Sequence, residues 1–337
     1  MFNQLKNKLL LAVLTLTCNF SYGQELQKIN SGGFAAAIWA HSYLAMTHLN
    51  KQGDSQIKRK YLTPSITGQK IGCLCITEPS AGSDVAGIRT KAIREGEFFT
   101  INGSKTFITN GVYSDYLIVA AKTNLTSKHS GISIFVIDRE TPGISATKLD
   151  KLGWKASDTG EIAFDNVKIP IKNLLGEEGK GFAYIMEHFA LERLIMGINA
   201  HARAKYALDY VVEYTSERKA FGKQLHKFQV LRHKIAEMAS KIEMCKEFNY
   251  SIAKRLDLGT YVVKEATMSK LLSTKMADEV IYDALQLLGG YGYMEEYPLA
   301  RLFRDSRLGP IGGGTSEILK EVIAKIIIDK KQSRSLI

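Results

Sequence analysis

The spacing of apolar residues changes twice along the chain and divides it into three regions. Between residues 31 and 62, apolar residues recur at helical spacing from Ala35 through Leu49, and Gly53 closes the run. From about residue 71 to 169, short β-branched or alternating runs follow, such as FFTIN, YLIVAA, ISIFVID and EIAFDNVKI, separated by turn sequences such as TNG and TPG. Runs of this kind predict an antiparallel β domain with hairpin connections.

After Pro170 the apolar period becomes helical and stays so to the end of the chain. Four long helices are predicted, and the third ends at Gly289 and Gly290, which suit a C-terminal cap. The four helices are expected near residues 181–215, 225–257, 261–288 and 315–330. Their apolar stripes predict a helical bundle.

These patterns predict an α+β protein with several domains. Its parts are a leader at 1–24, a short helical region at 25–70, a β domain at 71–172 and a bundle at 180–332. No later apolar run approaches the length that a transmembrane helix needs.

Composition and charge narrow the class of partner. The chain has 337 residues, of which 45% are hydrophobic and 23% charged, as in ordinary soluble globular proteins. Its formal net charge of +11 suits an acidic partner: nucleic acid, an anionic membrane face, or a phosphate-bearing cofactor or substrate. Because the basic residues are scattered, we expect phosphate-rich small molecules rather than nucleic acid.

The cysteines indicate a reducing compartment. Cys73 and Cys75 are two residues apart on one expected strand and share a face, a poor geometry for a mutual disulfide. A single Cys-x-Cys without a second Cys or His pair is weak evidence for zinc, and we expect no metal. We therefore interpret these two residues and Cys245 as buried thiols of a cytoplasmic protein.

The N-terminus indicates the opposite. Lys6 and Lys8 precede the apolar run Leu9–Leu16, and small residues follow at the spacing of a cleavage site. This pattern is typical of a secretory signal peptide and argues for export. The alternative is an apolar start created by a truncated or wrongly delimited gene.

The most specific local pattern is CITEPSAGSDVAG, residues 75–87. Pro79 and Gly82 shape a loop whose backbone and small hydroxyl side chains can approach a planar or phosphorylated ligand, although a solvated turn would have a similar composition. Four further motifs follow in order: INGSKTFITNG, LGWKASDTGEIAFDNVKIP, ERKAFGKQLHKFQ and QLLGGYGYMEEYPLARLFRD. Through these five segments the sequence, over roughly residues 31–330, resembles the acyl-CoA dehydrogenase family of flavoenzymes.

The resemblance implies a middle β-barrel, a C-terminal four-helix bundle, and FAD held between them and a neighbouring subunit. In the β domain, Thr77 would bond to the flavin ring, and Ser83 would approach both the cofactor and the acyl-CoA. Phe107 stands where the family often has Trp and still supplies an aromatic face. The residues that the resemblance assigns to FAD here are Leu74, Ile76, Thr77, Gly82, Ser83, Phe107, Ile108 and Thr109.

The resemblance also assigns FAD contacts to the bundle. Arg218 would bind the pyrophosphate, a task suited to a planar cation with several donors, although a surface ion pair would be the reading without the family. Thr315 and Glu317 would contact FAD near the start of the last helix, and a purely structural N-cap is an equal alternative for Thr315. The remaining assigned residues, expected at a subunit interface, are Phe221, Gln229, Gln286, Gly289 and Gly290.

The candidate catalytic base follows from a glutamate that is missing from the last loop. Many family members carry the glutamate directly before the Gly-Thr of the last loop, but the loop IGGGTSEILKE has Gly313 there. Long-chain and isovaleryl-type members place the base on the first bundle helix in a Glu-Arg-Leu context, which Glu192 matches in FALERLIMG. Gly313 would keep the backbone N–H that bonds the thioester carbonyl, and the neighbouring Arg193 would contact substrate.

Periodicity supports Glu192 independently of the family. The residues Ile185, Phe189, Glu192, Met196 and Asn199 are spaced four and three apart and so share a mostly apolar helical stripe. Burial raises the pKa of a carboxyl group towards a range useful for proton abstraction. The alternative is a structural ion pair, for example with His188 one turn earlier.

The implied activity is α,β-dehydrogenation of an acyl-CoA to a trans-2-enoyl-CoA, with electrons passed to an electron-transferring flavoprotein. The family is usually oligomeric, so a dimer or tetramer is expected. The chain departs from the family at its front, where several helices precede the segment that matches residue 31. This departure leaves a truncated, inactive or partner-binding relative as an alternative, and an acyl-CoA oxidase is another. A DNA-alkylation-response relative is disfavoured because the extra basic C-terminal domain expected there is missing.

Overall fold

The computed structural model describes residue 26 and residues 29–127 and 129–329. The predicted leader at 1–24 therefore lies outside the described residues. The chain forms two compact units. We call Gly33–His188 the sheet unit, and the described residues up to Gly32 together with those from Phe189 onward the helical unit.

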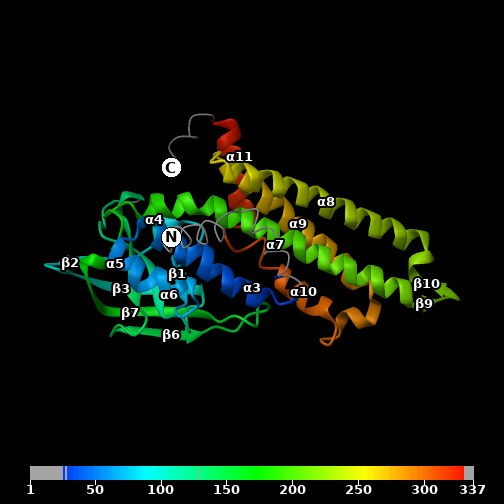
Figure 1. The fold of residues 1–337 in the computed structure, drawn as a ribbon, viewed down its shortest axis with the longest axis horizontal. Coiled ribbons are helices and arrows are strands. Elements are labelled where there is room, and N and C mark those ends of the chain that lie inside the picture. Colours follow the sequence, from blue (N-terminus) through cyan, green and yellow to red (C-terminus); the bar gives the residue numbers. More distant parts are fainter. Residues whose placement is uncertain (1–25, 27–28, 128, 330–337) are drawn as a thin grey trace, which may run out of the picture. The chain divides into compact units, whose positions relative to one another are not determined.

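An eight-stranded sheet forms the centre of the sheet unit, with the strand order β6-β7-β3-β2-β4-β5-β8 and β1 paired with β4 (Figure 1). Most neighbours are antiparallel, as predicted, but β4 pairs in parallel with both β1 and β2. The strands are β1 (Gly72–Cys75), β2 (Lys91–Glu95), β3 (Phe98–Thr109), β4 (Tyr116–Lys122), β5 (Ile132–Asp138), β6 (Ile144–Lys148), β7 (Thr159–Pro170) and β8 (Leu174–Leu175).

The burial of strands β4 and β5 explains why their sequences are continuously apolar. Six successive residues of each strand are buried, so both faces of this part of the sheet are covered. The core includes Phe99 and Phe135, whose rings meet edge to face with centroids 5.0 Å apart. Cys73 and Cys75 lie in the same core as free thiols, and Cys245 is a buried free thiol of the helical unit, as predicted.

The predicted N-terminal helical region is a series of short helices packed in the sheet unit. They are α3 (Gly32–Trp39), η1 (Ala40–Ala45), α4 (Met46–Gln52), α5 (Ser55–Ile57), η2 (Lys58–Leu62) and α6 (Thr63–Ile66). Gly53 ends α4, and the Asp54 carboxylate caps α5 by accepting two backbone N–H bonds. His41 links this region to the sheet, because its Nδ1 accepts the Gly72 N–H at 3.0 Å.

All four predicted long helices are confirmed, as α7 (Gly181–Glu217), α8 (Gln229–Asp257), α9 (Val263–Leu287) and α11 (Ser316–Ile328). Helix α10 (Pro298–Ser306), with Pro298 in its first turn, was not predicted. The short strands β9 (Lys219–Ala220) and β10 (Lys223–Gln224) form a hairpin after α7. None of the described helices is long and apolar enough to span a bilayer.

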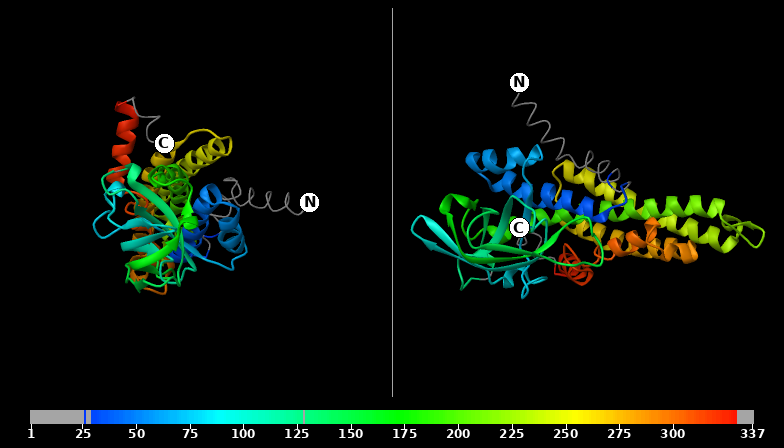
Figure 2. Two further views of the ribbon diagram at one scale, coloured as in Figure 1. Left: turned by 90° about the vertical axis from the view of Figure 1, so that its left-hand side faces the viewer. Right: turned by 90° about the horizontal axis from the view of Figure 1, so that it is seen from below.

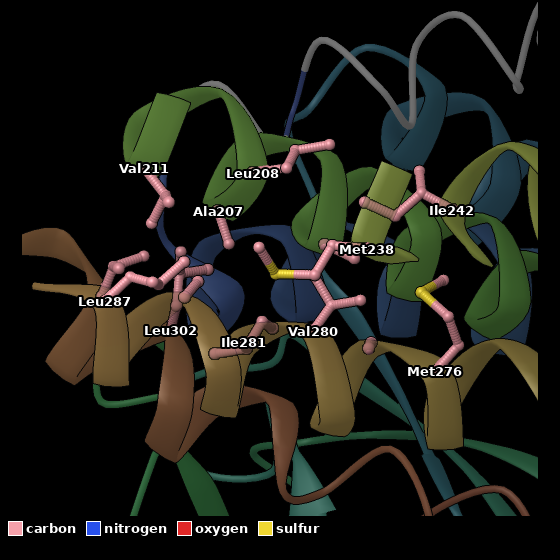
Figure 3. Packing of buried hydrophobic residues seen from close by; sticks show 14 of the residues in the cluster. Ala207, Leu208, Val211, Met238, Ile242, Met276, Val280, Ile281, Leu287 and Leu302 are labelled. Carbon is pink, nitrogen blue, oxygen red and sulfur yellow. The ribbon is translucent and has the colours of Figure 1, made fainter. Parts of the chain in front are cut away.

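Side chains from four helices meet in the main core of the helical unit. Figure 3 shows Ala207 of α7, Met238 of α8, Val280 of α9 and Leu302 of α10 directed into one apolar layer. Alanines on α7 keep the helices close, while leucine, isoleucine and methionine fill the space between them. Figure 2 shows α7, α8 and α9 running alongside one another, which matches the predicted bundle.

Two histidines of the sheet unit are buried against each other. The rings of His48 on α4 and His188 on α7 meet edge-on, with centroids 4.5 Å apart. Burial, followed by the charge of the neighbouring histidine, lowers the pKa of His48 to about 3. Burial likewise lowers the pKa of His188 to about 4, against a raising effect of Glu187. Both rings are therefore neutral at ordinary pH.

This pair makes stability depend on pH. Below about pH 6.5 these two histidines are protonated in the unfolded chain but stay neutral in the folded protein. The free energy of unfolding therefore falls as the pH drops from about 6.5 towards 4. Each such group contributes a slope of up to ~1.4 kcal/mol per pH unit. We expect His48→Gln to make the slope shallower by about one proton in urea titrations between about pH 7 and pH 4.5.

The matched control is His233→Gln, which alters an exposed residue of α8. It should leave the wild-type slope unchanged. Equal slopes for His48→Gln and the wild type would contradict the prediction.

Candidate active site

A buried ion pair fixes the loop of residues 75–87 from inside. The Lys105 Nζ on β3 donates to the Glu78 Oε1 at 2.7 Å and to the Ile76 carbonyl at 2.9 Å. The two charged side chains are 0% and 3% exposed. Burial opposes the charge on Glu78, but the Lys105 ammonium and the hydrogen bonds to the carboxylate hold its pKa below the usual range.

The loop is also attached through its backbone. The N–H groups of Arg89 and Thr90 both donate to the Glu78 carboxylate, and the Thr106 N–H donates to the Thr77 carbonyl at 2.9 Å. A buried ion pair is weak as a source of net stability, but breaking it is costly, so it holds one geometry. The loop and β3 therefore form one rigid piece.

Phe107 stands out on this piece. A register shift between Lys105 and Ile108 interrupts the pairing of β3 with β7, and Phe107 has a φ of +60°. Its ring is 70% exposed although the residue lies within a strand of the core sheet. Left-handed backbone at an aromatic residue costs free energy, and such strain is characteristic of functional surfaces. The bulge thus presents an aromatic face outward.

The other predicted residues of the sheet unit divide between surface and core. Gly82 and Ser83 are exposed, and open space surrounds the position that a Cβ at Gly82 would take. Leu74, Thr77 and Thr109 are partly exposed. The side chains of Ile76 and Ile108 are buried, so a ligand would meet these two residues through their backbone.

The predicted residues of the helical unit, apart from those near α11 and Glu192, are exposed, and Arg218 is among them. This exposed guanidinium lies 5.6 Å from the ring centroid of Tyr291, and Phe221 nearby is 95% exposed with a φ of +51°. At the exposed glycines Gly289 and Gly290, no heavy atom lies within 4 Å of the position that a Cβ would take, which leaves room for another molecule. Gln229 and Gln286 are exposed as well.

Glu192 occupies a different environment on α7. It is partly buried, and burial raises its pKa above the usual range, while the charges of Arg193 and Lys270 oppose that rise. Arg193 is itself buried and donates from Nη1 to the Thr267 hydroxyl at 3.1 Å. Its Nε has no hydrogen-bond partner among the described residues. Glu192 is thus a carboxylate with raised proton affinity, and the charges of two cations act on it.

The glycine turn before α11 lies directly against this carboxylate. Gly313 and Gly314 have φ values of +62° and +91°. A Cβ at position 313 would lie 3.1 Å from the Glu192 Oε1 and 2.6 Å from the Met196 Sδ. The backbone conformation therefore favours glycine at this position, and any side chain there would displace the ends of the Met196 and Glu192 side chains.

At the start of α11, Thr315 has the structural N-cap role that was the alternative to a cofactor contact. The Thr315 hydroxyl accepts the Ile318 N–H at 3.4 Å as the N-cap of the helix. Glu317 is exposed in the first turn.

Comparison with known proteins places this geometry in a family. Residues 73–167 match the model of the acyl-CoA dehydrogenase middle domain, and residues 179–328 match that of the C-terminal domain. The chain is 36% identical to a mitochondrial isovaleryl-CoA dehydrogenase of Pongo abelii, over 94% of this chain and 78% of that protein. The chain belongs to the acyl-CoA dehydrogenase family.

Two further relatives support the assignment. The mitochondrial long-chain specific acyl-CoA dehydrogenase of Mus musculus is 40% identical over 86% of this chain and 68% of its own length. The structure of butyryl-CoA dehydrogenase from Megasphaera elsdenii superposes with a TM-score of 0.90 at 36% identity, covering 93% of this chain and 82% of that one. The protein is therefore a FAD-dependent oxidoreductase of the acyl-CoA dehydrogenase family.

The residues present fit FAD. Phe107 offers a strained, exposed aromatic face that suits a flavin ring, and Arg218 offers an exposed multi-donor cation that suits a pyrophosphate. The open glycines 82, 289 and 290 allow close backbone approach.

Three residues of these sites were not predicted. Glu78 lies within the recognised loop motif. Lys105 occupies an inward position of β3, and a charged residue at such a position indicates a buried partner. Lys270 lies one helical turn after the buried Ala266, on the buried face of α9. These charges could not be paired from the sequence, because their partners are distant along the chain.

Lys105→Met would leave the Glu78 carboxylate buried without its cation. We expect a loss of about 3–5 kcal/mol in the free energy of unfolding, measured by urea denaturation. The double variant Glu78→Gln with Lys105→Met should recover part of that loss, because no buried charge remains. Lys91→Met, at an exposed position of β2, is the control. A Lys105→Met protein as stable as this control would contradict the role of the buried Glu78–Lys105 pair.

Gly313→Ala combines backbone strain with contacts that force the ends of the Met196 and Glu192 side chains to shift. Gly259→Ala is the matched control, because Gly259 has a φ of +74° with nothing within 4 Å. Left-handed strain alone costs about 1–3 kcal/mol, so denaturation should show that loss for Gly259→Ala and a larger one for Gly313→Ala. Equal losses would show that the turn has room for a side chain.

Proposed function

We propose that the protein catalyses α,β-dehydrogenation of an acyl-CoA thioester to a trans-2-enoyl-CoA. The observation that carries this proposal is the partly buried Glu192 carboxylate lying against the side-chain-free turn at Gly313. The turn occupies the position where many family members carry their base. A carboxylate supplied from α7 instead is the arrangement expected of long-chain and isovaleryl-type members.

In the proposed mechanism Glu192 acts as the general base that removes the α-proton. A raised pKa gives the carboxylate a stronger affinity for that proton, and a positioned general base contributes on the order of 10²–10⁴ in rate. The Gly313 N–H would donate to the thioester carbonyl and stabilise the enolate-like charge as the proton leaves. FAD, when bound, supplies the acceptor for the β-hydride.

The other residues would bind and orient. In the sheet unit, Thr77 and Phe107 would contact the flavin, and Ser83 would approach the acyl-CoA. In the helical unit, Arg218 would bind the pyrophosphate. Arg193, with a buried Nε that lacks a partner among the described residues, would face substrate.

We further propose long-chain or branched acyl groups, an electron-transferring flavoprotein as electron acceptor, and a dimer or tetramer. The relatives named for isovaleryl and long-chain substrates support the substrate class. The exposed Phe221 and the open glycines at 289 and 290 support a shared cofactor site between copies. The cytoplasmic location stays a prediction, as does the opposing leader at 1–24.

The test is anaerobic mixing of the purified protein with a panel of acyl-CoA thioesters while the flavin absorbance is followed. Wild-type protein should bleach. Glu192→Gln should retain FAD and bleach at least about 10²-fold more slowly. Glu187→Gln is the control, because Glu187 lies on the same helix with a side chain that is 49% exposed.

Other outcomes point elsewhere. Rapid bleaching of the flavin in Glu192→Gln would show that another residue is the base. Colourless wild-type protein would favour an inactive or partner-binding relative, and peroxide release on admitting oxygen would favour an oxidase.

A further inference from the structure

A buried lysine with no part in the mechanism above lies beside the proposed base. The Lys270 side chain on α9 is 0% exposed. A buried ammonium is costly unless it is paired, so its surroundings indicate what it does. Burial lowers the pKa of Lys270 to about 8, against the opposite effect of Glu192.

The Lys270 ammonium takes part in two kinds of interaction. Its Nζ donates a hydrogen bond to the carbonyl oxygen of Gly314, inside the glycine turn. It also acts electrostatically on Glu192, the carboxylate against which the turn packs. Lys270 therefore links the two parts that the proposed reaction requires, namely the base and the turn that holds the carbonyl donor.

The turn needs such a tether. Three successive glycines, Gly312–Gly314, have more backbone freedom than any other tripeptide, and two of them adopt positive φ. The Gly312 N–H bond to the Leu308 carbonyl and the Ser316 N–H bond to the Pro310 carbonyl close the turn on its own backbone, and the Thr315 cap fixes the chain after it. Among the described residues, the bond from Lys270 to the Gly314 carbonyl is the hydrogen bond that joins the turn to another helix.

The charges facing Glu192 are few. Arg193 on α7 and Lys270 on α9 are the cations that act on its carboxyl group. Arg193 is occupied with the Thr267 hydroxyl and lies against the Phe189 ring. The glycine turn contributes no charged side chain. Lys270 is thus the cation that both acts on Glu192 and donates to the turn.

We propose that Lys270 is a positioning residue, which holds the glycine turn against Glu192 and places a positive charge beside the turn that this carboxylate contacts. The proposal rests on the proposed function of Glu192 as the base. It assigns Lys270 no proton transfer and no contact with substrate.

The experiment compares Lys270→Met, Lys270→Arg and Lys275→Met. Lys275 lies on the same helix with a side chain that is 77% exposed, so its variant controls for loss of a lysine from α9. The first readout is the pH dependence of anaerobic flavin reduction by an acyl-CoA. Removing a nearby cation raises the pKa of a carboxyl group by about one unit or more.

Lys270→Met should therefore shift the acidic limb of the profile about one pH unit upward, a roughly tenfold loss of rate on that limb. Lys270→Arg keeps the charge and should restore the position of the limb. Lys275→Met should follow the wild type. A purely structural lysine would lower the rate equally at every pH, and that result would overturn the proposal.

The second readout does not need turnover. In protein labelled with ¹³C at glutamate carboxyl groups, the Glu192 resonance is identified by its loss in Glu192→Gln and then titrated by NMR. Lys270→Met should move its midpoint upward, whereas Lys270→Arg and Lys275→Met should not. An unchanged midpoint in a folded Lys270→Met protein overturns the proposal. If Lys270→Met does not fold, the Lys270→Arg variant decides. A Glu192 midpoint about one pH unit above that of the wild type, although the positive charge is kept, overturns the proposal.

The two readouts separate the two proposals. A shifted Glu192 resonance in a protein that no acyl-CoA reduces would support the placement of Lys270 and reject the proposed activity. Flavin reduction with neither shift would support the activity and reject Lys270 as its positioning residue.

Discussion

The contact between the Glu192 carboxylate and the turn at Gly313 is the constraint on which the helical unit's chemistry depends. A single methyl group at position 313 would lie 3.1 Å from the carboxylate oxygen and 2.6 Å from the Met196 sulfur. A side chain at 313 would therefore displace the carboxylate and the methionine sulfur from this arrangement. The chain carries its acid on the helix, where burial raises the pKa, and leaves the turn to its backbone.

The sheet unit solves a different problem, which is rigidity at an exposed surface. Phe107 is held outward in a strained conformation, and such a residue keeps its position only if its neighbours are fixed. The buried pair of Glu78 and Lys105, with the hydrogen bond between Thr106 and Thr77, supplies that support. An ion pair at this depth is better understood as a determinant of geometry than of stability.

Both units thus place a buried lysine behind a loop rich in small residues. Lys105 donates to the carbonyl of Ile76, and Lys270 donates to the carbonyl of Gly314. Loops that must approach a ligand closely lack bulky side chains that could pack them. A lysine reaching from a strand or helix can hold such a loop by its backbone and leave its outer surface clear.

Much of the fold could be predicted because it follows from periodicity. The four long helices were found within a few residues, since each has an apolar stripe several turns long. Helix α10 was missed because nine residues give little period, and the parallel pairing of β4 was missed because no hairpin turn marks it. Glu192 could be nominated from its stripe and from the empty position at Gly313.

The rest of the site could not be predicted because it joins residues far apart along the chain. Neither Glu78 with Lys105 nor Gly314 with Lys270 shares a local pattern, and only the folded chain brings each pair together. The strain at Phe107 likewise depends on the bulge between β3 and β7.

Exchange of the α-protons of a bound acyl-CoA with solvent deuterium tests the central claim most directly, because it isolates proton removal from hydride transfer. A thioester whose β-carbon is replaced by sulfur cannot be oxidised, and NMR can follow the loss of its α-proton signal in D₂O. We expect enzyme-dependent exchange with the wild-type protein and at least about 10²-fold slower exchange with FAD-loaded Glu192→Gln. Exchange at the wild-type rate in that variant would show that another group removes the proton.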